Sequence, residues 1–169
     1  MDIPYIDRIV NNLYVKDLKG TIKWVTELHA NQVDKAGQPY IGHVRRVHLN
    51  LCRLFPEASL DEQFAALLHD TLEDCEVTAE DLRTQGYSEA TIIMVEAVTK
   101  RKDQVISYQE RIDRLAESGN MGAIRVKIAD LMDNSNPNRL TNLSLIQASS
   151  LSKRYMRALR TLWSAVRES

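Results

Sequence analysis

The sequence predicts an all-α protein, and three observations support this prediction. Apolar residues recur three or four positions apart in most segments, which is the spacing of a helix with one buried face. Capping residues, among them Ser59 and Thr78, stand immediately before several of these segments. The sequence contains no convincing hairpin pattern, internal repeat or low-complexity tract. The chain is therefore expected to fold as a helical bundle.

The first half of the chain is expected to contain five helical segments. Thr21 can cap the second segment. Gly37 and Pro39 mark a turn before the third, because glycine allows a positive φ and proline cannot continue a helix. Ser59 and Glu62 form a capping box for the fourth. The expected segments are 3–18, 21–31, 41–55, one that runs from residue 60 into an acidic cluster at 69–74, and a short helix that starts near Thr78 and is closed by Gly86.

The second half is expected to contain four helices and a surface connection. Residues 88–100 are rich in β-branched residues, but their length and capping residues favour a helix over a strand. Gly119 is a stop signal for the next helix. The expected helices are 88–100, 107–118, a helix from Met121 to the acids at 130–133, and a last one at 151–166, with 138–150 as a polar connection.

Length and composition predict a single domain spanning residues 1–169, long enough to bury about two-thirds of its unfolded surface. No apolar run approaches the roughly 20 residues of a membrane span. The first residues lack the basic and apolar regions of a secretory signal. Cys52 and Cys75 form no C-x-x-C pair, which fits free thiols in a reducing compartment. We therefore expect a cytoplasmic protein with no membrane partner.

The charge balance predicts a small ligand. A formal net charge of −1 offers no basic footprint for nucleic acid, whose binding depends on many phosphate contacts. All four histidines fall between His29 and His69, which is a hint of a site. His29 and His48 are expected to have structural roles. The sequence leaves the oligomeric state open.

The segment around His69 carries the strongest chemical signal in the chain. On a helix, Glu73 lies near both His69 and Asp70, and Asp74 lies one turn beyond Asp70. Three carboxylates that close repel one another, and the apolar run before them makes desolvation costly unless a cation neutralises the site. A divalent metal explains the pattern. The alternative is a solvated helix end whose acids face water.

Two further residues complete a candidate metal site. His43 and Asp130, with His69 and Asp70, provide two imidazoles and two carboxylates from three helices. Such mixed ligands suit Mn²⁺, Fe²⁺ or Zn²⁺ better than Ca²⁺. A metal of this kind activates water and polarises a phosphoryl group, which points to phosphoester hydrolysis. Glu73 and Asp74 are then the candidate catalytic acids.

Four ordered motifs between about residues 20 and 140 resemble those of HD-domain phosphohydrolases, and specifically the hydrolase domain of the RelA/SpoT homologues, including their small stand-alone members. In that domain the motifs read H-x-x-Q-x-R-K/S-x-G-x-P-Y-I-x-H, A-L-L-H-D-T-x-E-D-T, V-T-K and K-L-A-D-R-L-H-N. Here they correspond to His29–His43, Ala66–Cys75, Val98–Lys100 and Lys127–Asn134. Four motifs in the same order are specific, whereas any one alone is weak. The resemblance implies an HD-domain helical bundle.

The resemblance also implies an activity and a set of residues. It implies removal of the 3′-pyrophosphate from ppGpp or pppGpp, with Mn²⁺ as the usual metal and Glu73 and Asp74 acting on the attacking water. The implied metal ligands are His43, His69, Asp70 and Asp130, and the implied nucleotide contacts are Lys35, Tyr40, Lys100 and Asn134.

The chain departs from the motifs at two places. Asp34 stands where the family has an arginine that packs on the guanine base, and an acid cannot provide that stacking. The D-R-L-H-N segment reads D-L-M-D-N here and so loses an arginine and a histidine. Hydrolysis of a nucleotide phosphoester is thus better supported than ppGpp as the substrate. The alternatives are a broader HD-domain nucleotidase or phosphatase and a catalytically silent HD-fold nucleotide sensor. The length of the chain predicts no synthetase activity.

Overall fold

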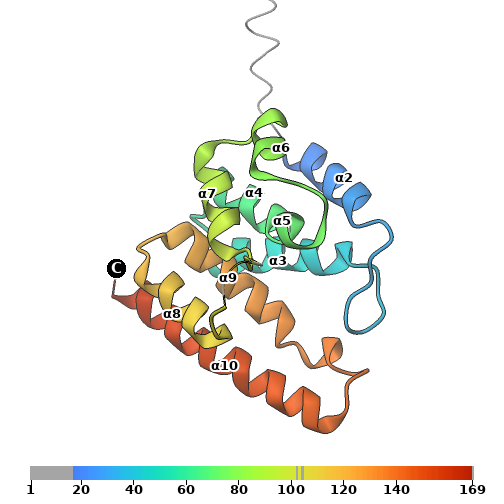
Figure 1. Ribbon diagram of the computed structural model, residues 1–169, viewed down its shortest axis with the longest axis vertical. Helices are drawn as coiled ribbons and strands as arrows, with labels where there is room; N and C mark the ends of the chain where they lie inside the picture. The colour runs from blue at the N-terminus through green and yellow to red at the C-terminus, as the bar shows by residue number, and fades with distance from the viewer. Residues whose placement is uncertain (1–16, 102, 104, 169) are drawn as a thin grey trace, which may run out of the picture.

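The computed structural model describes residues 17–101, 103 and 105–168, which form a helical bundle (Figure 1). Within these residues the only β-structure is an isolated bridge between Val33 and Pro39, so the all-α class is confirmed. The elements are α2 (Leu18–Leu28), α3 (Ile41–Leu54), α4 (Leu60–Leu68), α5 (Thr71–Asp74), α6 (Ala79–Thr84), α7 (Glu89–Val98), α8 (Tyr108–Glu117), α9 (Met121–Asn134), the 3₁₀ turn η1 (Pro137–Arg139) and α10 (Leu145–Arg167).

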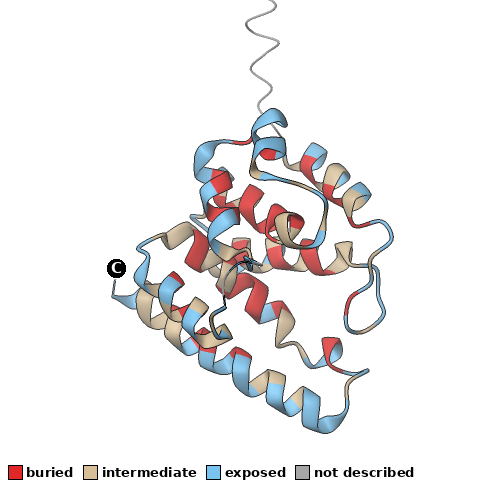
Figure 2. Cartoon of the chain, viewed as in Figure 1, coloured by how far each residue is buried: buried red, intermediate tan, exposed pale blue. Residues whose placement is uncertain are grey.

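Helices α3 and α9 lie at the centre of the bundle (Figure 1). Helix α9 packs against α3, α4, α7 and α10, and the outer helices α8 and α10 also pack on each other. Buried residues run along α3, α4 and α9 (Figure 2). They share one hydrophobic core that includes Val44, Leu67 and Ile128. The packing of α3 on α9 brings the first turn of α3 close to the last turns of α9.

Local capping chemistry explains why most helices begin and end where the sequence predicts. The Ser59 side chain accepts from the Glu62 amide, and the Glu62 side chain accepts from the Ser59 amide, so the predicted capping box starts α4. Gly37, Gly86 and Gly119 all adopt a positive φ, as their places in turns require. The predicted turn before α3 and the helices near 41–55, 88–100, 107–118 and 121–133 are confirmed.

The prediction of one continuous helix from residue 60 into the acidic cluster is wrong. Helix α4 ends at Leu68, and α5 begins at Thr71. Two side chains replace the helical hydrogen bonds at this break. The Thr71 hydroxyl donates to the Leu68 carbonyl over 2.8 Å, and the His69 ring is 2.9 Å from the Ala66 carbonyl. The break therefore turns His69 and Asp70 toward the interior.

The C-terminal third also differs from the prediction. Ser144 and Gln147 form a capping box, so the last helix starts at Leu145 and not at residue 151. Residues 137–139 form η1, and Arg139 in it is buried, so 138–150 is not simply a surface connection. Periodicity missed this because the exposed Leu145 and Ile146 disturb the amphipathic pattern at the start of α10.

Of the two helices predicted near the N-terminus, only the second can be compared with the structure. The expected helix at 3–18 lies outside the described residues, apart from its last two positions. The second helix is present, but its cap is Asp17 and not Thr21. The Asp17 carboxylate accepts from the Gly20 amide, whereas Thr21 is buried inside α2. Asp17 has the side chain that a helix N-terminus favours, and an earlier start lets Thr21 join the core.

None of the described helices is long and apolar enough to cross a membrane. Cys52 and Cys75 are free thiols.

Matched leucine substitutions test this arrangement of the core. Leu67 is 1% exposed and Leu145 is 90% exposed. We expect Leu67→Ala to lower the free energy of unfolding by about 2–5 kcal/mol, because it removes buried apolar surface and leaves a cavity. Leu145→Ala should change it by less than about 0.5 kcal/mol. Urea unfolding measures both values, and similar losses in the two variants would contradict the described packing.

Candidate metal centre and cavity

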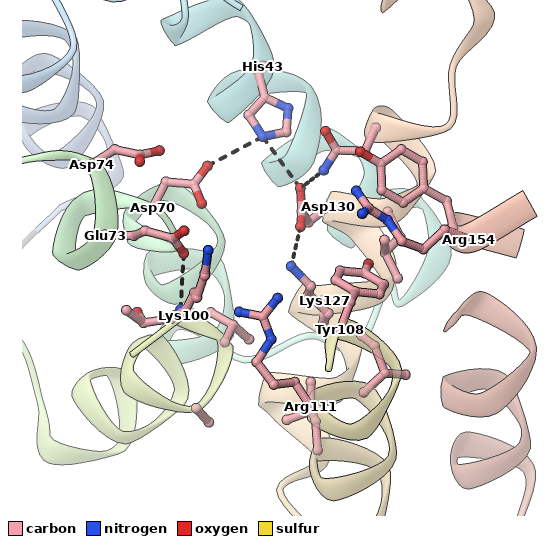
Figure 3. A pocket seen from close by; sticks show the side chains of 18 of the residues that line it. His43, Asp70, Glu73, Asp74, Lys100, Tyr108, Arg111, Lys127, Asp130 and Arg154 are labelled. Atoms are coloured by element: carbon pink, nitrogen blue, oxygen red, sulfur yellow. Dashed lines mark hydrogen bonds and ion pairs between the residues drawn. The ribbon is translucent and has the colours of Figure 1, made fainter. Parts of the chain in front are cut away.

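Four candidate ligands from separate parts of the chain meet near one point. His43 lies in the first turn of α3, His69 and Asp70 lie at the break between α4 and α5, and Asp130 lies near the end of α9. His43 Nε2 is 3.2 Å from His69 Nε2, 3.4 Å from Asp130 Oδ1 and 3.5 Å from Asp70 Oδ2. Figure 3 shows His43 between Asp70 and Asp130. The structure thus brings together the four residues that the sequence predicts as ligands.

The hydrogen bonds of the two histidines direct their Nε2 atoms toward the same point. His69 Nδ1 is 2.9 Å from the Ala66 carbonyl oxygen, and His43 Nδ1 is 2.7 Å from Asp133 Oδ2. Both oxygens can only accept, so each ring donates from Nδ1. In the neutral tautomers each Nε2 then carries a lone pair, and the two lone pairs face each other across 3.2 Å. That arrangement is repulsive unless a cation or a proton lies between them.

The electrostatics of the cluster favour a positive charge. Burial by itself lowers the pKa of His69, but the charge of Asp70, a hydrogen bond to it and the charge of Asp130 raise that pKa to about 9. Burial by itself raises the pKa of Asp70, yet the charge of His69 and hydrogen bonds from both histidines hold it well below its ordinary value. The donor atoms of His43, His69 and Asp130 lie within 4.8 Å of one another, and Asp70 Oδ2 lies 2.8 Å from His69 Nε2. This set of two nitrogen and two oxygen donors fits a divalent cation.

A cavity of about 740 Å³ adjoins the cluster. Glu73 and Asp74 line it beside Asp70 (Figure 3). The Glu73 carboxylate accepts from the Lys100 amide over 3.0 Å, which fixes its direction. Burial, together with the charges of Asp70 and Glu73, raises the pKa of Asp74 above its ordinary value. The two acids thus have different environments, one held by a backbone donor and the other more easily protonated.

The predicted nucleotide contacts all line this cavity, but they differ in what they bind. The Tyr40 hydroxyl donates to Asp70 Oδ2 over 2.5 Å, and the Asn134 amide donates to Asp130 Oδ1, so both support candidate ligands. Lys35 donates to the Tyr155 hydroxyl over 2.7 Å. The Lys100 side chain has no ion pair among the described residues. Lys35 and Lys100 therefore offer cationic groups to the cavity.

Sequence reasoning missed a cationic wall, formed by Arg111 and Arg154, on the side of the cavity away from Glu73 and Asp74 (Figure 3). Arg154 lies 4.7 Å from the centre of the Tyr108 ring, and Arg111 lies 5.6 Å from it (Figure 3). Neither arginine has a carboxylate partner among the described residues. The Tyr108 hydroxyl is buried and has no hydrogen-bond partner among the residues that the structure describes. These residues lie on α8 and α10, where amphipathic patterns gave no sign of a shared wall.

Sequence reasoning also gave no role to Asp133, Arg46 and Arg139. Asp133 is buried and accepts from His43, from Arg46 Nε over 2.6 Å and from Arg139 Nη1 over 2.9 Å. Burial raises the pKa of Asp133, but the hydrogen bonds from His43 and Arg46 and the charges of these two residues lower it to about 2. The only sequence signal for Asp133 was its place in the fourth motif, where it replaces the histidine of D-R-L-H-N.

Asp34 does not present a bare negative charge to the cavity. Its side chain is 2% exposed, and its Oδ2 lies 3.4 Å from Arg139 Nε and 3.6 Å from Arg46 Nη2. Its Oδ1 accepts from the amides of Ala36 and Gln38, which holds the turn before α3. The acid that replaces the family arginine is therefore neutralised by two guanidinium groups of this chain.

The fold and the cluster define the class of protein as an all-α HD-domain helical bundle. A solved structure described as a metazoan orthologue of SpoT, which hydrolyses ppGpp and plays a role in starvation responses, matches with a TM-score of 0.68. That match has 23% identity and covers 89% of this chain and 93% of the other. The predicted HD-domain fold is therefore confirmed.

Sequence comparison leads to a narrower group. No protein-family model matches the chain. It is 33% identical over 129 residues to the guanosine-3′,5′-bis(diphosphate) 3′-pyrophosphohydrolase of Aquifex aeolicus, covering 72% of this chain and 18% of that protein. It is 34% identical over 94 residues to the protein of the same name from Vibrio cholerae, and this match covers 54% of this chain and 12% of that protein. It is 41% identical over 73 residues to a GTP pyrophosphokinase of Streptomyces coelicolor, and this match covers 43% of this chain and 8% of that protein.

The chain therefore spans less than a fifth of the length of these curated relatives. The resemblance to the RelA/SpoT homologues that the four motifs predict is confirmed.

The pKa of Asp133 predicts an acid-dependent loss of stability. Folding lowers this pKa from its ordinary 3.8 to about 2, so ionised Asp133 stabilises the fold above pH 4, and this contribution is lost as the pH falls through 2. Asp133→Asn lacks the ionisable group. The difference in unfolding free energy between wild type and Asp133→Asn should shrink by about 2 kcal/mol from pH 6 to pH 2. Urea unfolding in the presence of a chelator measures it, and a constant difference would contradict the assigned interactions.

Proposed function

We propose that the protein is a metal-dependent phosphohydrolase that removes the 3′-pyrophosphate from ppGpp or pppGpp, releasing pyrophosphate and GDP or GTP. The single observation that carries this proposal is the geometry at the cavity. Two imidazoles and two carboxylates converge at its edge, and Glu73 and Asp74 lie beside them. The names of the Aquifex and Vibrio relatives support the choice of substrate.

The proposed metal ligands are His43, His69, Asp70 and Asp130. Mn²⁺ is the proposed ion, with Fe²⁺ and Zn²⁺ as alternatives that suit the same donors. When bound, such an ion lowers the pKa of a water ligand and polarises a phosphoryl oxygen. The protein's own contribution is to hold the donors in place through the hydrogen bonds of Tyr40, Asn134, Asp133 and the Ala66 carbonyl.

Glu73 and Asp74 are proposed to move the protons. Glu73, whose carboxylate is fixed by the Lys100 amide, orients the water and takes its proton as the water oxygen attacks the phosphorus on the ribose 3′-oxygen. The bond between that phosphorus and the 3′-oxygen breaks. Asp74, whose pKa is raised, supplies a proton to the leaving oxygen. Different environments for two neighbouring carboxyl groups suit these opposite roles.

The cationic groups of the cavity suit an anionic nucleotide. Lys35, Lys100, Arg111 and Arg154 line the cavity, Lys100 beside Glu73 and Arg154 on the side away from Glu73 and Asp74 (Figure 3). Phosphate groups bind lysine and arginine strongly, and a base can stack on the faces of tyrosine and arginine side chains. A nucleotide with more than one phosphate group matches this distribution of charge. The proposed nucleotide contacts are Lys35, Tyr40, Lys100 and Asn134.

A broader HD-domain nucleotidase is the second candidate, and Asp34 is the observation that favours it. The carboxylate of Asp34 holds a turn and an ion-pair network, so this position offers no guanidinium for stacking on guanine. A catalytically silent nucleotide sensor is the third. The single-domain organisation of residues 1–169, the cytoplasmic location and the absence of a nucleic-acid partner stay predictions.

A substrate panel separates the three candidates. The protein is incubated with Mn²⁺ and, in separate reactions, ppGpp, GTP, ATP and 3′-phosphorylated nucleotides, and the products are resolved by ion-exchange chromatography. We expect pyrophosphate and GDP from ppGpp, and no turnover of the other nucleotides. Release of phosphate from many nucleotides would favour the broader enzyme. Tight binding without turnover would favour the sensor.

Histidine and glutamate variants test the proposed roles. We expect His69→Ala to lose both bound Mn²⁺ and turnover, because it removes a ligand. Glu73→Ala should keep Mn²⁺ and lose turnover by a factor of at least about 100, the usual contribution of a general base. His48→Ala is the control, since His48 contacts Gln63 and Cys52 and does not line the cavity. Metal analysis and initial rates measure both properties, and unchanged metal content in His69→Ala would defeat the proposed ligand set.

A further inference from the structure

Arg139 occupies a position that joins several parts of the proposed metal centre. It lies in η1, after the end of α9, and its side chain is only 6% exposed. Its Nη1 donates to Asp133 Oδ2 over 2.9 Å and to Asn134 Oδ1 over 3.1 Å, and it also contacts His43 Nδ1. Both hydrogens of this nitrogen thus go to the two residues that end α9, and none is left for His43 Nδ1, which itself donates to Asp133.

Each of these two residues holds a different proposed ligand. Asp133 accepts from Nδ1 of His43, a residue of α3. The Asn134 amide donates to Oδ1 of Asp130, a residue of α9. Arg139 therefore reaches one imidazole and one carboxylate of the centre, each through a single intermediate side chain.

The chemistry of arginine determines how these intermediates are oriented. A guanidinium group can donate but cannot accept. Because Arg139 occupies Asn134 Oδ1, the Asn134 amide must turn its NH₂ group toward Asp130. Because Arg139 also binds Asp133 Oδ2, that carboxylate is held where it accepts from His43 Nδ1. This bond leaves the His43 Nε2 lone pair for a metal.

Asp34 and Arg46 balance the buried charge. Asp34 Oδ2 lies 3.4 Å from Arg139 Nε, and Arg46 Nε donates to Asp133 Oδ1 over 2.6 Å. Two carboxylates and two guanidinium groups thus form a closed network with no net formal charge. The Arg46 side chain is 41% exposed, whereas those of Asp34 and Asp133 are 2% exposed. Removing Arg139 therefore leaves buried carboxylate charge uncompensated, which is costly.

We propose that Arg139, paired with Asp34, is a positioning residue of the metal centre that fixes the orientation of His43 through Asp133 and of Asp130 through Asn134. This inference rests on the proposed metal ligands. It also gives Asp34 a role within this chain: the carboxylate that replaces the family arginine neutralises the guanidinium that supports two ligands.

Metal titration of the chain of residues 1–169 tests the inference without using activity. We expect Arg139→Gln to weaken Mn²⁺ binding by about 10–100-fold, because glutamine can accept as well as donate and no longer fixes Asp133 and Asn134. Arg139→Lys keeps a group that only donates, and it should lie between wild type and Arg139→Gln. Arg83→Gln is the control, since Arg83 pairs with the exposed Glu80 and Glu89 outside the cavity. Calorimetric titration with Mn²⁺ alone measures the affinities.

The metal dependence of turnover separates positioning from substrate binding. If Arg139 acts through the ligands, the rate of Arg139→Gln with ppGpp should recover toward wild type as Mn²⁺ is raised, with KM unchanged at saturation. A raised KM at saturating Mn²⁺ would mean that Arg139 touches the substrate and would overturn the inference. Wild-type affinity for Mn²⁺ in Arg139→Gln would also overturn it, as would equal losses in the lysine and glutamine variants.

Asp34→Asn on its own covers the case in which Arg139→Gln fails to fold, and a double-mutant cycle is measured where both single variants fold. Asparagine keeps an acceptor for the amides of Ala36 and Gln38 and removes only the charge. We expect Asp34→Asn to weaken Mn²⁺ binding, and the double variant to lose less than the sum of the two single losses. Strict additivity, or no effect of Asp34→Asn, would contradict the pairing. Failure of wild type to hydrolyse ppGpp while these metal affinities behave as expected would reject the proposed substrate and leave this inference standing.

Discussion

The structure depends on the approach of two imidazole nitrogens, His43 Nε2 and His69 Nε2, to within 3.2 Å of each other beside two carboxylates. Each ring donates its Nδ1 proton to a fixed oxygen, so the neutral rings direct lone pairs at the same point. Repulsion of this kind in a buried place requires a positive charge. The charges of Asp70 and Asp130 beside these nitrogens, with a hydrogen bond to Asp70, raise the pKa of His69 to about 9 although burial lowers it. A divalent cation meets the requirement with the donors that are present.

The fold supplies this approach through two features. The packing of α3 on α9 brings His43 to Asp130, and the break between α4 and α5 turns His69 and Asp70 inward. A continuous helix through residue 74 would carry these two side chains around the helix axis instead of presenting them together. The hydroxyl of Thr71 and the ring of His69 satisfy carbonyls at the break, so the interruption costs few hydrogen bonds.

Local sequence signals predicted the helices well and long-range electrostatics poorly. Capping boxes and glycine turns act between residues three or four apart, so Ser59, Thr78 and Gly119 could be interpreted correctly. The motifs predicted that His43, His69, Asp70 and Asp130 would meet, and the structure brings them together. The arginine partners of Asp133 and Asp34 could not be predicted. Arg46 is 87 residues away from Asp133 in the sequence, and Arg139 lies in a 3₁₀ turn that the sequence did not predict. The cationic wall of Arg111 and Arg154 was missed because α8 and α10 meet only in the folded bundle.

Anomalous diffraction from crystals grown with Mn²⁺ tests the central claim most directly, because it locates the ion without reference to any substrate. The account predicts one strong peak about 2.0–2.3 Å from His43 Nε2, His69 Nε2 and an oxygen each of Asp70 and Asp130. No peak there in crystals that contain Mn²⁺ elsewhere, or a peak bound only by Glu73 and Asp74, would contradict it.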